Sequence, residues 1–220
     1  MTPFDGVQTV IFDYDGTLHD SRRIYIPAFL KAYQYLVKAG KAEPEEWEEA
    51  DITRWLGYSK KEMWEAFMPD LEAAFQTKAS NIIGQTMLEK IEEGQAALYP
   101  EAIQTLDYLK DKGYQLIFLS NCSVSYMERH RQAFGLNYYF DAFYCSEQYA
   151  FKKSKKEIVE LFKDDYKGEL LIVGDRFQDI EAGEVEGVHA VGCTYGFGQG
   201  SELSAADKII HNISELKNLL

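Results

Sequence analysis

In the stretch V10-I-F-D-Y-D-G-T-L-H-D-S21, an apolar run ends abruptly at two aspartates that are one residue apart. The apolar run predicts a buried strand, and the Asp-Gly pair that follows predicts a turn. Asp13 and Asp15 would then hold two negative charges side by side, where they repel each other. A cation is therefore expected at the end of this strand.

Further apolar runs alternate with helical patterns along the chain. The predicted strands are Val7–Phe12, Gln115–Ser120, Ala142–Cys145, Leu170–Gly174 and His189–Cys193. The predicted helices between them are Glu101–Lys112, Val124–Phe134, Lys155–Lys163 and Asp179–Glu186. Continuous apolar strands joined by helices predict an α/β fold with a Rossmann-like parallel sheet that helices cover on both faces.

The interval from about Ile24 to Ala97 breaks this alternation, since it contains helical patterns and no convincing strand. The helices predicted there are Ile24–Ala39, Pro44–Trp55, Lys60–Phe67 and Leu71–Glu93. We therefore predict that residues 1–20 and 97–220 form an α/β core domain and that residues 21–96 form an inserted all-helical cap domain. A chain of 220 residues is long enough to hold both.

Composition excludes several classes of partner. The formal net charge of −13 argues against general affinity for a nucleic acid polymer or an anionic membrane. No window approaches the roughly 18 unbroken apolar residues of a membrane span, and the D-x-D motif begins too early to leave room for a signal peptide. These observations predict a cytoplasmic protein. The three cysteines have no C-x-x-C spacing and indicate neither a disulfide framework nor a zinc site.

Polar side chains stand where four of the predicted strands end. In chain order they are Asp13 and Asp15, Ser120 and Asn121, Lys152 and Lys153, and Asp175 with Asp179. In an open parallel sheet, ligands bind beyond the carboxyl ends of the strands. If these ends converge, they assemble carboxylates, a hydroxyl and an ammonium group in one cleft.

Each motif also has a simpler interpretation. D-x-D-G opens a calcium-binding EF-hand loop, but Leu18 and Ile24 stand where that loop requires Gly and Glu. Ser120 alone would be a cap, and Lys152 alone would be a solvated lysine in a basic run. G196-F-G-Q-G200 lacks the features of a nucleotide-binding loop and predicts a flexible surface turn.

The joint pattern resembles the haloacid dehalogenase superfamily of aspartate-nucleophile phosphotransferases over essentially the whole chain. The motifs that carry the resemblance are D13-Y-D-G-T-L18, L116-I-F-L-S-N121 and L171-I-V-G-D-R-F-Q-D179. A helical insert after the first motif is similar to the cap of the branch that includes phosphoglycolate phosphatases and β-phosphoglucomutases. The third motif departs from that branch, because K152-K-S-K155 replaces K-P-x-P. Matching the first lysine selects Lys152, with Lys153 as the alternative.

The resemblance implies a role for each strand-end residue. Asp13 would be the nucleophile and a ligand of Mg²⁺, and Asp15 would be the general acid and base and bind the metal through its backbone carbonyl. Asp175 would be a further metal ligand, and Asp179 would support these ligands. The residues expected to bind the substrate phosphate are Ser120, Asn121 and Lys152. Arg54 is the expected substrate contact from the cap.

The function predicted from this pattern is that of a Mg²⁺-dependent phosphatase, which hydrolyses a small phosphorylated metabolite through an aspartyl-phosphate. A phosphomutase of the same fold is an alternative, because Asp15 suits both reactions. A non-catalytic binding protein is a remote alternative. A dehalogenase is disfavoured by the second aspartate of the first motif, and a phosphonate hydrolase would need a cap lysine that the sequence does not identify.

Overall fold

The computed structural model describes residues 4–220, which separate into two compact units. The first unit contains the described residues up to Asp20 together with Leu98–Leu220, and the second is Ser21–Ala97. The second unit is thus an insertion in the sequence of the first. This insertion begins after the turn that follows the first strand, and it ends before the helix that leads to the second strand.

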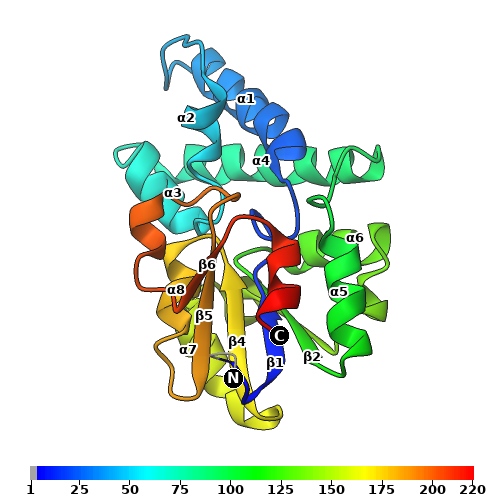
Figure 1. Ribbon diagram of the computed structural model, residues 1–220. Helices are drawn as coiled ribbons and strands as arrows, with labels where there is room; N and C mark the ends of the chain where they lie inside the picture. The colour runs from blue at the N-terminus through cyan, green and yellow to red at the C-terminus, as the bar shows by residue number, and fades with distance from the viewer. Residues whose placement is uncertain (1–3) are drawn as a thin grey trace. The chain divides into compact units, whose positions relative to one another are not determined.

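The first unit is built on a single parallel sheet (Figure 1). Its strands are β1 (Val7–Phe12), β2 (Gln115–Ser120), β3 (Ala142–Cys145), β4 (Glu169–Gly174), β5 (Val188–Cys193) and β6 (Lys208–Ile210). Their order in the sheet is β3-β2-β1-β4-β5-β6. The predicted Rossmann-like α/β class is confirmed. The edge strand β6 was not predicted, because Lys208 and Ile209 are exposed and form no buried apolar run.

Helices cover this sheet. They are α5 (Ala102–Asp111), α6 (Val124–Ala133), α7 (Lys155–Phe162) and α8 (Phe177–Ala182), with 3₁₀ turns η1 (Leu136–Tyr138), η2 (Ser146–Tyr149), η3 (Lys163–Asp165), η4 (Gly200–Leu203) and η5 (Ile213–Asn218). One buried cluster joins Ile11, Ile117 and Ile172 of the strands to apolar residues of α7 and α8. Helix α5 contacts η5 on the face of the sheet opposite to α7 and α8 (Figure 1).

The register of the central strands brings their carboxyl ends to one level. Phe12, the last residue of β1, pairs with Phe118 of β2 and with Val173 of β4. The backbone N–H of Asp13 also donates to the carbonyl of Val173, over 2.9 Å. The residues that follow β1 and β4 are therefore neighbours, although about 160 residues of sequence separate them.

The second unit consists of helices α1 (Arg22–Lys38), α2 (Glu49–Thr53), α3 (Lys60–Phe67) and α4 (Ala73–Glu92). Helices α1 and α4 make the most extensive helix–helix contact of this unit. Helix α3 begins with a capping box, in which Ser59 accepts from the backbone of Glu62 and the Glu62 side chain accepts from the backbone of Ser59. Such reciprocal bonds satisfy two N–H groups that the first turn would leave without partners.

The helix predicted over Pro44–Trp55 was wrong in length, because only Glu49–Thr53 is helical. Like charges four apart on a helix repel each other, and Glu45 and Glu49 have this spacing. The hydroxyl of Tyr33 also donates to the backbone carbonyl of Glu43 over 2.8 Å, which holds the chain outside a helix. Residues 43–48 therefore form an irregular segment.

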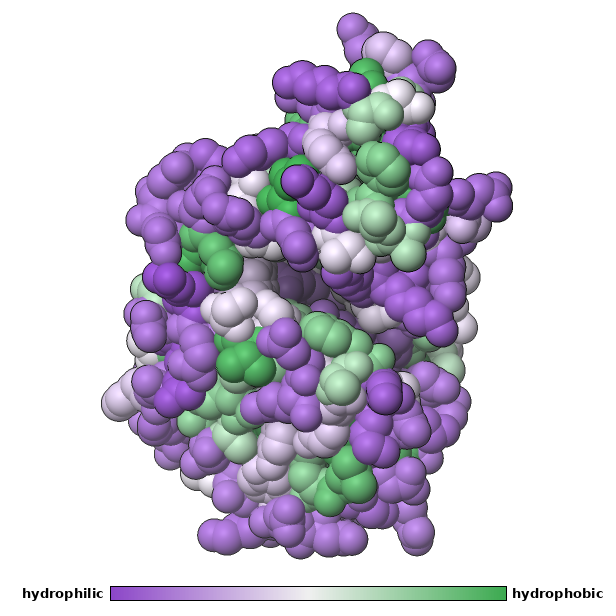
Figure 2. Space-filling view, turned by 180° about the vertical axis from the view of Figure 1, so that it is seen from behind, coloured by the Kyte–Doolittle hydropathy of each residue, from purple (hydrophilic) through white to green (hydrophobic). Residues whose placement is uncertain are grey.

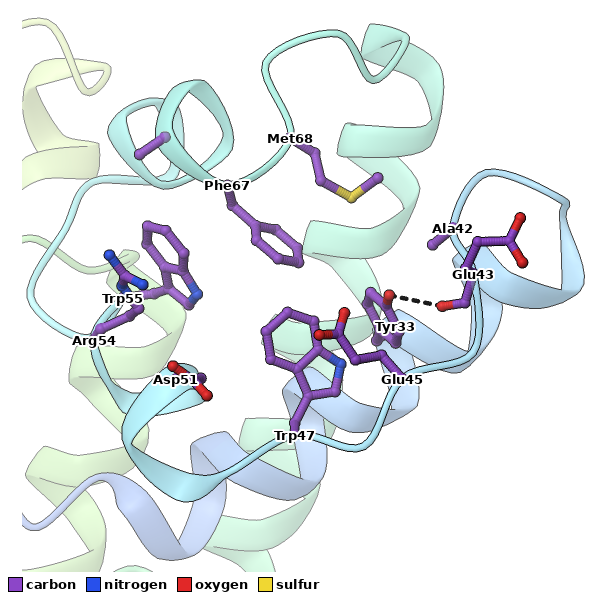
Figure 3. Close-up of a pocket in the computed structure, with 11 residues that line it drawn as sticks. Tyr33, Ala42, Glu43, Glu45, Trp47, Asp51, Arg54, Trp55, Phe67 and Met68 are labelled. Carbon is purple, nitrogen blue, oxygen red and sulfur yellow. Dashed lines mark hydrogen bonds between the residues drawn. The ribbon is translucent and has the colours of Figure 1, made fainter.

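Aromatic rings fill the interior of the second unit. Trp47 lies edge-on to Phe29 and Tyr33, with ring centroids 5.3 and 5.1 Å apart. A cavity of about 490 Å³ opens beside Trp47, Trp55 and other residues of this unit (Figure 3). Arg54 lines this cavity, and its guanidinium lies 4.9 Å from the centroid of the Trp55 ring.

On the face that Figure 2 shows, hydrophilic residues predominate and hydrophobic ones are scattered among them. The large exposed apolar side chains are Val124, Tyr138, Phe151, Leu161, Phe177 and Ile209. Within residues 4–220, no helix combines the length and the apolar character that crossing a bilayer requires. The three cysteines are free thiols, and Cys145 and Cys193 are buried.

Candidate active site

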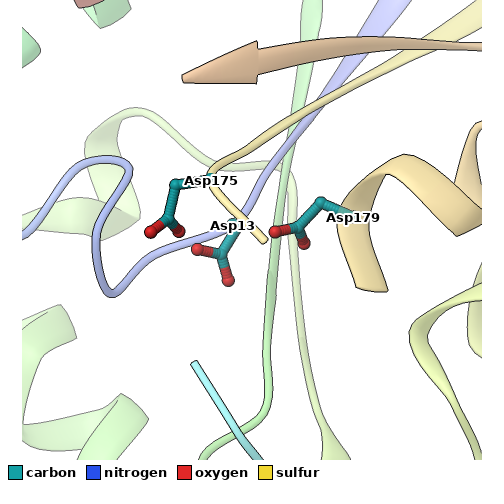
Figure 4. A group of neighbouring side chains, drawn as sticks. All are labelled: Asp13, Asp175 and Asp179. Carbon is teal, nitrogen blue, oxygen red and sulfur yellow. The ribbon is translucent and has the colours of Figure 1, made fainter. Parts of the chain in front are cut away.

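Three carboxylates from separate segments meet at the carboxyl edge of the sheet (Figure 4). Asp13 follows β1, Asp175 follows β4, and Asp179 lies in α8. One oxygen from each lies within 4.8 Å of the others, and all three side chains are buried. The sequence-based expectation that these strand ends converge is met for these three residues.

Burial makes this cluster electrostatically costly in its ionised form. The pKa of Asp175 is raised to about 7, first by burial and then by the charge of Asp179. The pKa of Asp13 is also raised well above its usual value, and burial is again the largest cause. Carboxylates in such surroundings need a proton or a bound cation to be stable.

Lys155 supplies one positive charge to the cluster. Its Nζ donates to Asp13 and, over 2.6 Å, to Asp179, and its side chain is only 3% exposed. Burial alone would lower the pKa of Lys155, but Asp13 and Asp179 outweigh burial and raise it. The ammonium group is therefore charged at neutral pH.

The lysine expected at this place was Lys152, and the structure corrects that expectation. Lys152 is exposed and Lys153 is half-buried, whereas Lys155 contacts Asp13 directly. Lys155 is the first residue of α7 and lies on the same buried face as Ile158 and Phe162. The helix thereby points this side chain into the site, while Lys152 precedes the helix.

The donor set fits a hard divalent cation. Three carboxylates against one ammonium group leave two negative charges when all of them are ionised. The oxygen donors are all carboxylates, with no nitrogen or sulfur donor in the group, and Mg²⁺ prefers such ligands. Asp13, Asp175 and Asp179 are the described residues that could hold it.

A glycine-rich loop after β5 packs against Asp175, which corrects the prediction of a flexible surface turn. The backbone N–H of Phe197 donates to Oδ2 of Asp175 over 2.5 Å. A Cβ added at Gly196 would lie 2.3 Å from the same oxygen, and one at Gly198 would lie 1.8 Å from the backbone carbonyl of Asp175. This loop therefore needs glycine because its backbone approaches the site so closely.

Thr17 was not singled out from the sequence, although it belongs to the first motif. Its hydroxyl lies 3.2 Å from Oδ2 of Asp13 and 3.5 Å from Oδ1 of Asp175. Tyr195 donates its own hydroxyl to the backbone carbonyl of Thr17 over 3.0 Å. Thr17 thus joins the ends of β1 and β4. The sequence signal that could have identified Thr17 is its position inside the D-x-D-G-T motif.

Asp15 is not a member of the carboxylate cluster. The chain leaves the extended conformation after Asp13, and the carbonyl of Tyr14 accepts from the backbone N–H groups of Leu18 and His19. In this turn the carboxylate of Asp15 contacts His19 at 2.8 Å and Tyr126 at 2.7 Å. Its side chain is 16% exposed.

Ser120 and Asn121 lie where β2 ends, next to β1 in the sheet. The side chain of Ser120 is buried, and Oδ1 of Asn121 accepts from the hydroxyl of Ser146 over 2.7 Å. Ser120 pairs with Cys145 at the end of β3. Both residues therefore occupy the carboxyl edge of the sheet at which the carboxylates meet.

A buried histidine lies beside the turn that carries Asp15. The ring of His130 is wholly buried, and its Nδ1 lies 2.7 Å from the hydroxyl of Tyr14. Burial lowers the pKa of His130 to about 3, with a further contribution from His19. His130 is therefore neutral, so Nδ1 can accept the hydrogen of Tyr14.

We expect His130 to make the protein sensitive to acid. Its pKa is lower in the folded state than in the unfolded chain, so unfolding takes up a proton below pH 6.5, and stability falls as the pH decreases towards 3. By pH 5 the loss reaches about 2 kcal/mol. The raised pKa values of Asp13 and Asp175 shift stability in the opposite direction over this range, so the measurement compares two proteins. Between pH 7 and pH 5, urea unfolding should show the wild type losing about 2 kcal/mol relative to His130→Asn, which keeps an oxygen acceptor for Tyr14. Equal changes in both proteins would contradict the assignment.

Comparison with known proteins identifies the family of this chain. The family model described as haloacid dehalogenase-like hydrolase matches residues 7–187. Phosphoglycolate phosphatase of Photobacterium profundum is 24% identical over 228 residues, covering 98% of this chain and 96% of that protein. Phosphoglycolate phosphatase of Escherichia coli is 25% identical over 241 residues, with coverage of 98% and 93%.

Solved structures share the fold. A predicted phosphoglycolate phosphatase from Haemophilus somnus superposes with a TM-score of 0.82 at 20% identity, covering 97% of this chain and 98% of that one. A mutant of CbbY from Rhodobacter sphaeroides, in complex with xylulose-(1,5)-bisphosphate, gives a TM-score of 0.77 at 18% identity and covers 96% of each chain.

Proposed function

Because the chain belongs to the haloacid dehalogenase-like hydrolase family, we propose that it is a Mg²⁺-dependent phosphatase of a small phosphorylated metabolite. The enzyme class, a phosphoric monoester hydrolase, follows from this membership and from the phosphatases that the chain resembles. The observation that carries the finer proposal is the buried group formed by Asp13, Asp175, Asp179 and Lys155. Phosphoglycolate is the first substrate to test, because similar proteins are named for it.

Asp13 is the proposed nucleophile. Its carboxylate would attack the phosphorus in line and form an aspartyl-phosphate, which divides one difficult displacement into two easier ones. An anionic carboxylate can approach an anionic ester only if charge is neutralised on both. Lys155 supplies part of that charge, and its contacts with Asp13 and Asp179 hold the nucleophile in a fixed position.

A metal ion held by Asp13, Asp175 and Asp179 would supply the remaining positive charge and polarise the phosphoryl oxygens. Asp15 would protonate the leaving oxygen and then remove a proton from the water that hydrolyses the intermediate. Ser120 and Asn121 would donate hydrogen bonds to the phosphoryl group. The inserted helical unit would act as a cap that selects the substrate and excludes water, with Arg54 as its proposed contact.

The test is a screen of phosphorylated metabolites, including phosphoglycolate, sugar phosphates and nucleotides, with release of inorganic phosphate as the readout. We expect release from one chemical class when Mg²⁺ is present and loss of release in excess EDTA. Asp13→Asn protein, prepared in the same way, gives the background. Isomerisation of a sugar phosphate without release would favour the phosphomutase instead, and metal-independent release would contradict the role of the carboxylate cluster.

A further inference from the structure

Two donors hold one oxygen of the Asp15 carboxylate. The hydroxyl of Tyr126 donates to Oδ1 over 2.7 Å, and Nδ1 of His19 lies 2.8 Å from the same atom. An ionised carboxylate can only accept, so Nδ1 of His19 carries the hydrogen of this bond. Both donors are buried, and neither belongs to the D-x-D-G-T-L motif, which ends at Leu18.

The turn fixes the position of His19. Its backbone carbonyl accepts from the N–H of Gly16 over 3.0 Å, and its backbone N–H donates to the carbonyl of Tyr14 over 2.9 Å. Its ring stacks on that of Tyr14, with centroids 5.2 Å apart and planes 13° apart. The backbone and the ring of His19 are therefore both held in place, and Nδ1 keeps its position beside the carboxylate of Asp15.

Tyr126 is fixed from a different element. It lies in the first turn of α6, where its backbone N–H donates to the capping hydroxyl of Ser123 over 3.3 Å. Its ring packs against His130, with centroids 4.3 Å apart. The two donors therefore reach Asp15 from the turn after β1 and from α6, and together they define one orientation of its side chain.

We propose that His19 and Tyr126 are positioning residues, which hold Oδ1 of Asp15 so that Oδ2 gives and takes the proton during the reaction. This inference rests on the proposed role of Asp15 as the general acid and base. Proton transfer depends steeply on geometry, and a displacement of about 1 Å can lower a rate by about 10²-fold. The two donors would keep the carboxylate of Asp15 in its productive orientation.

The role of a general acid depends on the leaving group. An alkyl phosphate releases an alkoxide, a strong base that needs a proton as the bond breaks. A 4-nitrophenyl phosphate releases a phenolate that is stable without one. Misplacing Asp15 should therefore lower kcat/KM for the alkyl substrate and leave the aryl substrate little changed, whereas a general structural defect lowers both.

The experiment compares kcat/KM for 4-nitrophenyl phosphate and for the alkyl phosphate that the screen finds fastest. For His19→Leu and Tyr126→Phe we expect a loss of about 10²-fold on the alkyl phosphate alone. His19→Asn should recover most of it, because its Nδ2 occupies the place of Nδ1, while His19→Gln places its donor elsewhere and should not. Tyr14→Phe removes a hydroxyl from the same aromatic cluster without touching the carboxylate of Asp15, and it should lack this selectivity.

Asp15→Asn separates this inference from the proposed function. If Asp15→Asn loses activity selectively on the alkyl phosphate while His19→Leu and Tyr126→Phe lower both substrates equally, the positioning role is overturned and the function stands. The positioning role is also overturned if His19→Asn recovers no more activity than His19→Leu. If Asp15→Asn itself shows no selectivity, the general acid is elsewhere and the inference falls with it. Tyr126→Phe removes one oxygen, so it provides the test should His19→Leu fail to fold.

Discussion

Asp13→Asn is expected to reduce phosphate release by about 10⁴-fold or more, because an amide cannot attack phosphorus as a carboxylate does. The folded state should survive the change. Burial raises the pKa of Asp13 well above its usual value, so a neutral amide of the same shape suits this position. Asp175 and Asp179 also lose a repulsive neighbour. We therefore expect the thermal midpoint of the metal-free variant to equal or exceed that of the wild type.

Asp15→Asn is the matched control for Asp13→Asn, since it removes the same charge from the same turn but keeps the nucleophile. It should slow both chemical steps and allow the phosphorylated enzyme to accumulate, which intact-protein mass spectrometry detects as one added phosphoryl group. Asp13→Asn should show no such species. Near-normal turnover by purified Asp13→Asn protein would defeat the assignment of the nucleophile.

Lys155→Met is the second change with a large expected effect. Removing one partner of a buried ion pair leaves the other uncompensated, which costs about 3–5 kcal/mol of stability. Here Asp13 and Asp179 both lose the ammonium group that contacts them. The nucleophile also loses its orienting partner, so we expect kcat to fall by about 10²-fold or more. Urea unfolding and initial rates at saturating substrate measure the two effects.

Two neighbouring lysines provide the contrasts for this variant. Lys152 is exposed, so Lys152→Met should change stability by no more than about 0.5 kcal/mol. Lys156 follows Lys155 on the same helix and pairs with Glu184 at the surface, so Lys156→Met controls for the loss of a helix lysine. If Lys152→Met abolished activity and Lys155→Met did not, the lysine proposed from the structure would be wrong.

The fold was predictable because its signals are local. Each of the five predicted strands is a short apolar run, and the interval without such runs is the helical unit. The edge strand β6 gave no such signal, because two of its three residues are exposed. The predicted helix over Pro44–Trp55 failed because a contact from Tyr33 and crowding of acidic side chains outweigh helical periodicity there.

The site was predictable in part. Asp13 and Asp175 follow strand ends and Asp179 lies in the first turn of α8, so the sheet and the start of that helix bring them together. The lysine was misassigned because motif matching fixed the register at Lys152. Helical periodicity would have identified Lys155, since Ile158, Val159 and Phe162 continue its buried face. The approach of the Gly196 loop to Asp175 depends on tertiary packing, which local patterns do not encode.

The order of strands has a consequence for synthesis on the ribosome. Strand β1 lies between β2 and β4, and both of these emerge later, β2 after more than one hundred further residues. Domains fold as units while translation proceeds, but long-range parallel pairing must wait for its partners. The apolar segment Val7–Phe12 therefore leaves the exit tunnel with neither neighbour made. During this interval, we expect the nascent polypeptide to depend on chaperones that shield this segment.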